Sequence, residues 1–384
     1  MKKSLHAALM CSALVLSFGL ATASAQESVS ASEAENDNLY FVELSGSPTA
    51  DGNSIANIRA EKTRFSSAAA SAGVRYSERR SYDTLFNGYS VKASPSQRAA
   101  LATLPGVKAI WPIDVIQAPE FNPGEGAAPD LAAAIAMTGA DVVQNSLGIT
   151  GAGIKVAVMD TGIDYDNADL GGDGVARSNS PVFPTARVIR GWDFVGDAFT
   201  GSETPVPDPY PDDCFGHGTH VAGIVGAKGA VTGVAPGVVF GSYRVFGCNG
   251  STTSDIMLAA MERALADGMQ VLNMSIGSSN QWPQYPTAAA ASRLVRKGMV
   301  VVASIGNSGP GGSPADGPYA AGAPGTGADV IGVASYDNTR VTLQLDNGGT
   351  LIVNNTDRPL VVKTAEYSSY SFGFGGKTDQ LIPP

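Results

Sequence analysis

Two patterns of hydrophobic and polar positions divide the chain. Between residues 39 and 112, short apolar runs alternate with segments of helical periodicity. The runs predict strands over 39–44, 74–80, 85–93 and 107–111, and the periodic segments predict helices over 54–71 and 94–104. Ser94, Pro95 and Gln97 have the pattern of a capped helix start. The resulting order, β-α-β-β-α-β, is typical of a ferredoxin-like module, which we assign to residues 39–115.

From residue 130 onward the apolar runs are continuous, as in strands that are buried on both faces. They cover 155–159, 269–274 and 299–303, and amphipathic segments over 254–267 and 287–297 separate them. Strands that alternate with helices predict an α/β fold, with a parallel sheet that carries helices on both faces. We assign this fold to residues 130–335. Strand-like runs at 341–345 and 351–353 predict the start of a further β-rich domain over 336–384.

The first 25 residues have the order of a secretory signal peptide. Lys2 and Lys3 precede an apolar stretch over 7–20, and small residues follow up to Ala25. The apolar stretch is shorter than the roughly 20 residues of a membrane-spanning helix. We therefore expect cleavage before Gln26, a secreted or periplasmic protein, and no membrane anchor.

Composition narrows the choice of partners. The 384 residues carry a net charge of −10, which argues against a nucleic-acid surface. The charge is unevenly divided, because residues 39–115 hold nine basic and six acidic side chains whereas residues 116–384 hold 14 and 25. Opposite net charges favour docking of the two modules. Between them, residues 113–129 are rich in Pro, Gly, Ala and acidic residues, which predicts a linker with a processing site.

Two cysteines remain after removal of the signal peptide, which contains Cys11. Disulfides persist in the compartments to which a secretory signal leads. We therefore predict a bond between Cys214 and Cys248.

Histidine occurs outside the signal peptide only at positions 217 and 220, within the run Gly-His-Gly-Thr-His-Val-Ala-Gly (216–223). Two interpretations arise from this run. Cys214, His217 and His220 could supply three ligands of a zinc site, for which elemental analysis would find stoichiometric metal. Alternatively, His217 is a general base at the start of a helix that the glycines allow to pack closely.

Two other polar residues follow predicted strands. Asp160 ends the buried run 155–159, where a carboxylate can orient an imidazole. Asn307 follows the run 299–303, where a side-chain amide can donate a hydrogen bond to a developing oxyanion. The carboxyl ends of parallel strands meet at one edge of a sheet, so these residues and His217 form one candidate site.

The runs 158–164 (VMDTGID) and 216–223 (GHGTHVAG) resemble the catalytic Asp and His motifs of the subtilisin-like serine proteases. Gly306-Asn307 resembles their oxyanion-hole motif, and the three motifs follow in the family's order. The resemblance implies that Asp160 orients His217, that His217 is the general base and acid, and that Asn307 stabilises the tetrahedral intermediate. Residues 39–112 are similar to the inhibitory propeptide that precedes such enzymes.

The same resemblance implies a cleft for polypeptide substrates. A peptide would lie extended in it, as a strand added between two edges of the protein. The implied substrate-binding residues are Gly250, Ser251, Ser275, Ile276 and Gly277. A disulfide between Cys214 and Cys248 would brace this cleft.

The family's serine motif, Gly-Thr-Ser-x-Ala-x-Pro, is absent from the 384 residues. The stretch 330–338 resembles subtilases in which a protease-associated domain is inserted between the oxyanion Asn and the serine. We therefore expect the chain to be an N-terminal fragment of a precursor, inactive as given, with its serine beyond residue 384. The rival interpretation is a peptide-binding relative that has lost the serine. The downstream coding sequence discriminates between the two interpretations. A Gly-Thr-Ser-x-Ala motif there would support the fragment, and a stop codon after Pro384 would support the rival.

No redox or nucleotide cofactor is implied, and the expected partners are polypeptide substrates and the chain's own propeptide. Asp169 matches a calcium ligand of the family, but residues 224–232 contain neither Asp nor Asn as further ligands. We therefore predict no metal at this position, and leave calcium in the complete protein open.

Overall fold

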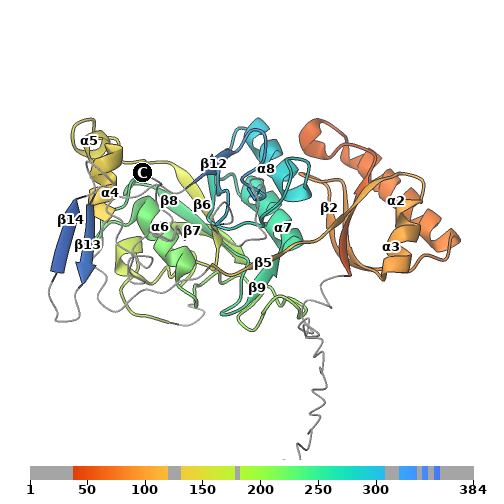
Figure 1. Cartoon of the computed structure of the whole chain (residues 1–384), viewed down its shortest axis with the longest axis horizontal. Helices are drawn as coiled ribbons and strands as arrows, with labels where there is room; N and C mark the ends of the chain where they lie inside the picture. The colour runs from red at the N-terminus through yellow and green to blue at the C-terminus, as the bar shows by residue number, and fades with distance from the viewer. Residues whose placement is uncertain are drawn as a thin grey trace, which may run out of the picture.

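The computed structural model describes residues 38–119, 131–177, 182–307, 320–334, 340–344 and 350–354, the last two segments as backbone (Figure 1). The predicted signal peptide lies outside the described residues, as do residues 120–129 of the predicted linker and most of 336–384. Within the described residues, no helix has both the length and the apolar character needed to cross a membrane.

Residues 38–112, called here the N-terminal module, form a four-stranded antiparallel sheet with two helices (Figure 1). The strand order is β2-β3-β1-β4. The elements are β1 (Leu39–Leu44), η1 (Thr49–Asp51), α2 (Ile55–Ser71), β2 (Ser77–Tyr82), β3 (Gly88–Lys92), α3 (Pro95–Ala102) and β4 (Val107–Pro112). The predicted β-α-β-β-α-β order is confirmed.

Local sequence signals explain these elements. The Ser94 hydroxyl accepts a hydrogen bond from the amide of Gln97, which fixes the start of α3. In β1 the side chains alternate, so that Val42 packs with Phe65 beneath the helices while Phe41 belongs to a core on the opposite face. The sheet of this module is therefore apolar on both faces.

Residues 131–334, called here the large module, contain a six-stranded sheet in the order β12-β11-β10-β6-β8-β7. All of its strand pairs are parallel. Its strands are β6 (Lys155–Asp160), β7 (Val188–Asp193), β8 (Val239–Arg244), β10 (Val271–Met274), β11 (Val300–Ser304) and β12 (Ile331–Val333). Its helices are α4 (Leu131–Thr138), α5 (Ala140–Asn145), η2 (Ala168–Leu170), α6 (His217–Gly226), α7 (Ser254–Ala266) and α8 (Pro286–Arg296).

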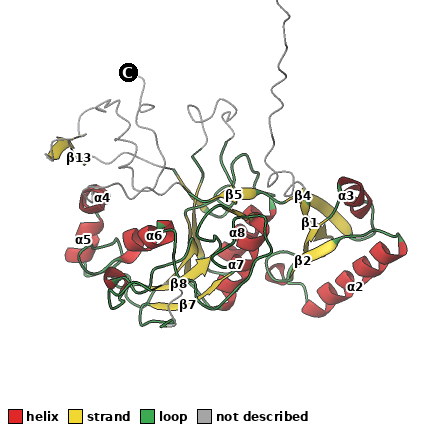
Figure 2. Cartoon of the chain, turned by 90° about the horizontal axis from the view of Figure 1, so that it is seen from below, coloured by secondary structure: helices red, strands yellow, loops and turns green. Residues whose placement is uncertain are grey.

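Successive side chains of β6 show how the helices cover this sheet. Val158 packs in a core with Val221 of α6, whereas Met159 packs in the core that contains Met261 of α7 and Leu294 of α8. Helices therefore lie on both faces of the parallel sheet (Figure 2). The predicted α/β fold is confirmed.

The N-terminal module packs against α7 and α8 with the sheet face that its own helices leave uncovered (Figure 2). We call this contact the docking face. Phe41 meets Tyr285 there with ring centroids 6.3 Å apart, and Arg79 forms an ion pair with the buried Asp255 of α7. The Glu262 side chain of α7 completes the contact by accepting backbone N–H groups of the N-terminal module.

Beyond β4 the chain continues into the large module. Residues 115–117 form β5 (Val115–Gln117), which pairs antiparallel with β9 (Ser251–Thr253). The start of the predicted linker is thus a strand, because β9 offers an open edge for hydrogen bonding. Farther along, β13 (Arg340–Gln344) and β14 (Thr350–Asn354) form an antiparallel hairpin where strand-like runs were predicted.

Candidate active site

The carboxyl end of β6 carries Asp160, and α6 begins at His217. Both side chains are buried, and His217 Nδ1 lies 2.7 Å from Asp160 Oδ1. Burial disfavours the charged imidazolium, but attraction by the Asp160 carboxylate outweighs that cost and raises the pKa of His217 above its ordinary value of 6.5. The pair therefore has the geometry and the electrostatics of a base with its orienting carboxylate.

A second carboxylate fixes the start of the helix that carries His217. Asp213 Oδ1 accepts the backbone N–H groups of Phe215 and Gly216, and its Oδ2 accepts the N–H and the hydroxyl of Thr219. These contacts satisfy amides at a helix terminus that would otherwise lack partners. Asp213 thereby holds the first turn of α6 in place.

The glycine after His217 allows α6 to approach the turn that follows β6. Its amide donates a 2.8 Å hydrogen bond to the Thr161 hydroxyl. A Cβ atom added at Gly218 would lie 2.2 Å from the carbonyl oxygen of Gly162, a distance that excludes any side chain. A glycine at position 218 is therefore a packing requirement for the contact between His217 and Asp160.

His217 lines a cavity of about 500 Å³ at this edge of the sheet. One side of the cavity is the turn after β10, and another is the end of the segment after β11, where Asn307 is exposed. The predicted site residues that line it are His217, Ser275, Ile276, Gly277 and Asn307. His220 also lines the cavity, and burial lowers its pKa with help from the neighbouring His217.

The remaining predicted substrate residues, Gly250 and Ser251, border β5 instead of the cavity. Ser251 pairs with Gln117, and the Gly250 carbonyl accepts the amide of Ala118 at 2.9 Å. Gly250 has a φ of 87°, and a Cβ atom there would lie 2.4 Å from the carbonyl oxygen of Thr200. β5 itself lines the cavity, so the chain's own segment occupies the position that the sequence assigns to an added peptide strand.

The predicted disulfide between Cys214 and Cys248 is present in the structure. It joins the segment before α6 to the segment before β9. Because both sulfur atoms are bonded to each other, Cys214 offers no thiolate, and the zinc interpretation loses one of its three ligands.

Asp169, the residue that matches a calcium ligand, accepts the backbone N–H groups of Ala230 and Val231 with its two carboxylate oxygens. These residues lie in the segment where the other ligands of that site would be expected. The residues present do not fit a calcium ion, because this segment offers no side-chain oxygen other than the hydroxyl of Thr232.

Sequence reasoning brought Asp160 and His217 together but missed Asp213, Thr161 and Arg244. An Asp shortly before a predicted helix start is a capping signal that points to Asp213. No local pattern points to Arg244, whose partners lie 30 or more residues away for the most part.

Comparison with known proteins identifies the fold. Residues 151–378 match the subtilase family, and residues 24–117 match the peptidase inhibitor I9 family. The first match covers more than half of the chain. The chain belongs to the subtilase family. As a subtilase, it carries in its N-terminal module a propeptide of the inhibitor I9 type.

Several relatives of this subtilase are proteases. Minor extracellular protease Vpr of Bacillus subtilis (strain 168) is 33% identical over 291 residues, which are 74% of this chain and 34% of Vpr. The PIII-type proteinase of Lactococcus lactis subsp. cremoris (strain SK11) is 28% identical over 86% of this chain and 18% of its own length. The chain therefore spans about a third or less of these two relatives.

A solved structure shows the same fold. Fervidolysin from Fervidobacterium pennivorans, a keratinolytic enzyme related to subtilisin, matches with a TM-score of 0.51 and 21% sequence identity. The match covers 83% of this chain and 45% of fervidolysin.

Proposed function

We propose that this subtilase is the precursor of a secreted endopeptidase that cleaves peptide bonds by a Ser-His-Asp mechanism, with its serine outside the 384 residues. The observation that carries the proposal is the buried contact between His217 Nδ1 and Asp160 Oδ1 beside a cavity that the chain's own β5 borders. The family membership and the names of the relatives support it.

In this mechanism the serine hydroxyl attacks the carbonyl carbon of the peptide bond while His217 Nε2 accepts the hydroxyl proton. Asp160 keeps the proton on Nδ1 and stabilises the imidazolium that forms. His217 then gives the proton to the departing amine. Asn307 donates its side-chain N–H to the oxyanion of the tetrahedral intermediate.

The substrate would lie where β5 lies in this structure. β5 pairs with β9 on one side, and Ser275, Ile276 and Gly277 wall the cavity on the other. The propeptide would thus inhibit the enzyme by occupying the cleft with its own tail until it is cut in 113–129. We further propose that β13 and β14 begin an inserted protease-associated domain, and that residues 1–25 direct secretion.

A serine-directed fluorophosphonate tests this proposal. The 384-residue chain should not be labelled, whereas the chain extended by its downstream coding sequence should be labelled after propeptide removal. His217→Ala should abolish labelling, and Asp160→Asn should slow it by about 10⁴-fold. Arg190→Lys, at an exposed position of β7, serves as the control.

A stop codon directly after Pro384 would favour the rival proposal of a peptide-binding relative without catalysis. In that case no extended chain exists, and the 384-residue protein should bind extended peptides once β5 is displaced. Labelling of the 384-residue chain itself would contradict both proposals.

A further inference from the structure

A buried arginine stands beside the candidate active site. Arg244 ends β8, and the strand register places it between Asp160 of β6 and Asp193 of β7. Its side chain is 1% exposed, although it carries a full charge. A charge at such a depth needs several partners to offset its loss of water.

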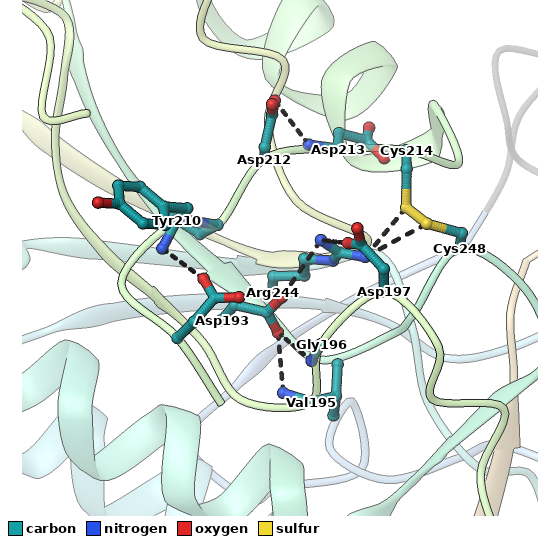
Figure 3. Close-up of polar contacts among 12 residues, drawn as sticks. Asp193, Val195, Gly196, Asp197, Tyr210, Asp212, Asp213, Cys214, Arg244 and Cys248 are labelled. Carbon is teal, nitrogen blue, oxygen red and sulfur yellow. Dashed lines mark hydrogen bonds and ion pairs between the residues drawn. A yellow bond between two sulfur atoms is a disulfide. The ribbon is translucent and has the colours of Figure 1, made fainter. Parts of the chain in front are cut away.

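Arg244 uses all three of its guanidinium nitrogens, and Figure 3 shows its contacts with Asp197 and the disulfide. Nε donates to the carbonyl oxygen of Phe246 at 2.9 Å. Nη1 donates to Asp197 Oδ1 at 2.7 Å and forms an ion pair with Asp193 Oδ2 at 3.2 Å. Nη2 lies 3.0 Å from the sulfur of Cys214 and 3.6 Å from that of Cys248.

The disulfide that Arg244 contacts is connected along the chain both to the helix of His217 and to the edge of the cleft at Gly250. On one side, Cys214 directly follows Asp213, the residue that caps α6 beneath His217. On the other side, the amide of Cys248 donates to the carbonyl oxygen of Asp197, and two residues later Gly250 binds the strand in the cleft. The guanidinium therefore contacts the disulfide that links the start of the His217 helix to the edge of the cleft.

We propose that Arg244 is a positioning residue that acts through the Cys214–Cys248 disulfide to set the spacing between His217 and the cleft strand β9. The inference rests on the proposed function, because it assigns to Arg244 the placement of that site's base relative to its substrate. Arg244 touches neither the substrate position nor His217, so it acts only through the groups that it holds.

The fork shape of arginine suits this role. Its donors fan out in one plane toward the strand end, the loop at Asp197 and the disulfide, whereas lysine has a single nitrogen. Asp193 accepts the amides of Val195 and Gly196, and burial raises its pKa to about 6 despite the charge of Arg244. Arg244 thus has a carboxylate on a strand and another on a loop as fixed anchors.

The test compares Arg244→Lys with the full wild-type chain by two measurements. The first is the titration of His217 by imidazole NMR, which is simple to assign because the chain has three histidines. The second is hydrogen exchange of the amides in β5 and β9. We expect Arg244→Lys to move the His217 pKa toward its ordinary value and to raise exchange in β5 and β9 about tenfold. Arg190→Lys, on the exposed part of β7, should change neither.

A second variant covers the case in which Arg244→Lys does not fold. The Asp197 side chain is 44% exposed, so Asp197→Ala should fold while it removes one anchor of the guanidinium. We expect the same changes from it, at about threefold in exchange. If either folded variant leaves both the His217 titration and the β9 exchange as in the wild type, the positioning role is overturned.

Removal of the disulfide separates positioning from general stability. Because Arg244 is proposed to act through the disulfide, Cys214→Ala/Cys248→Ala should reproduce the Arg244→Lys changes, and combining the two should add little. Additive effects would mean that Arg244 acts by another route and would overturn the proposal. If imidazole NMR of the wild-type chain shows no hydrogen bond between His217 Nδ1 and Asp160, the pairing fails, and with it the proposed function, whatever Arg244 does.

Discussion

On the docking face the N-terminal module contacts the large module with the side chains of Arg79 and Tyr82, whereas in the cleft the segment that follows the module adds β5 to β9 through main-chain hydrogen bonds. Side-chain contacts depend on which residues meet. Main-chain pairing accepts almost any residue, which suits a cleft that must later receive other sequences. We infer from this difference that the docking face gives the N-terminal module its specific affinity for the large module, whereas β5 fills the cleft without specificity for sequence.

The largest expected effect concerns the ion pair on the docking face. The Asp255 side chain is fully buried, and burial disfavours its charge, but Arg79 and Arg80 hold the pKa of Asp255 below its ordinary value. Arg79→Met leaves this carboxylate without its ion-pair partner and should lower the free energy of unfolding by about 3 kcal/mol. Urea denaturation of the full chain measures the loss.

Arg59→Met is the matched control, because Arg59 is exposed on α2. It should change stability by less than about 0.5 kcal/mol. Equal losses in the two variants would mean that the charge of the module, not the pairing with Asp255, provides the affinity.

A smaller effect is expected at Glu262, whose Oε1 accepts the backbone N–H groups of Thr84 and Leu85 at 2.9 and 2.7 Å. Glu262→Ala leaves both donors without this acceptor and should cost about 2 kcal/mol. Glu262→Gln keeps an oxygen at the same place and should cost clearly less. If the two variants lose the same stability in urea denaturation, the charge of Glu262 matters more than its hydrogen bonds.

The cleft strand should respond to loss of a main-chain donor but not of a side chain. Ala118→Pro removes the N–H that binds the Gly250 carbonyl and should cost about 1 kcal/mol, which hydrogen exchange in β9 would detect as a roughly fivefold increase. Gln117→Ala, an exposed position of β5, should leave exchange unchanged. If Gln117→Ala raises exchange in β9 more than Ala118→Pro does, the cleft binds β5 through side chains as well as through the main chain.

The sequence predicts the two kinds of contact unequally. The strands 39–44 and 155–159 follow from apolar patterns; the structure has the first at these bounds as β1 and the second as β6, which is one residue longer. β9 has the sequence Ser-Thr-Thr and no apolar pattern, so only its pairing with β5 makes it a strand. Likewise β7 contains Arg190 and Gly191, which interrupt the apolar run of an otherwise buried sheet.

The residues of the candidate site also differ in how well the sequence predicts them. Asp160 and His217 stand in compact motifs, so a single sequence suffices to pair them. Asp213 and Arg244 act through hydrogen bonds whose geometry depends on the fold, and Arg244 in particular binds Cys214 across 30 positions of the chain. The contacts of Arg244 leave no local signal and appear only in the three-dimensional structure, whereas Asp213 could have been found from its place shortly before a predicted helix start.

The smallest expected effect uses pH to separate the two contacts. Asp114 lies just before β5, and its Oδ2 accepts hydrogen bonds from Ser278 and Gln281 at 2.6 Å each. Burial raises the pKa of Asp114 above its ordinary value, in contrast to the lowered pKa of Asp255. A carboxyl group with a raised pKa binds more protons in the docked state, so the cleft contact should tighten as the pH falls through that pKa.

The Asp255 contact on the docking face should respond in the opposite direction. The contribution of Asp255 is complete above its ordinary pKa of 3.8 and is lost only as the pH falls through its lowered value. As the pH falls from neutrality through the raised pKa of Asp114, exchange protection in β5 should therefore rise about twofold after correction for intrinsic exchange rates, whereas Asp255 adds no change to the protection of α7 over that range. Asp114→Asn should abolish the rise in β5. A rise that persists in this variant would assign the pH response to another group. Burial also raises the pKa of Glu262 on α7, so only a parallel change in α7 that persists in Glu262→Gln would mean that the two contacts open together.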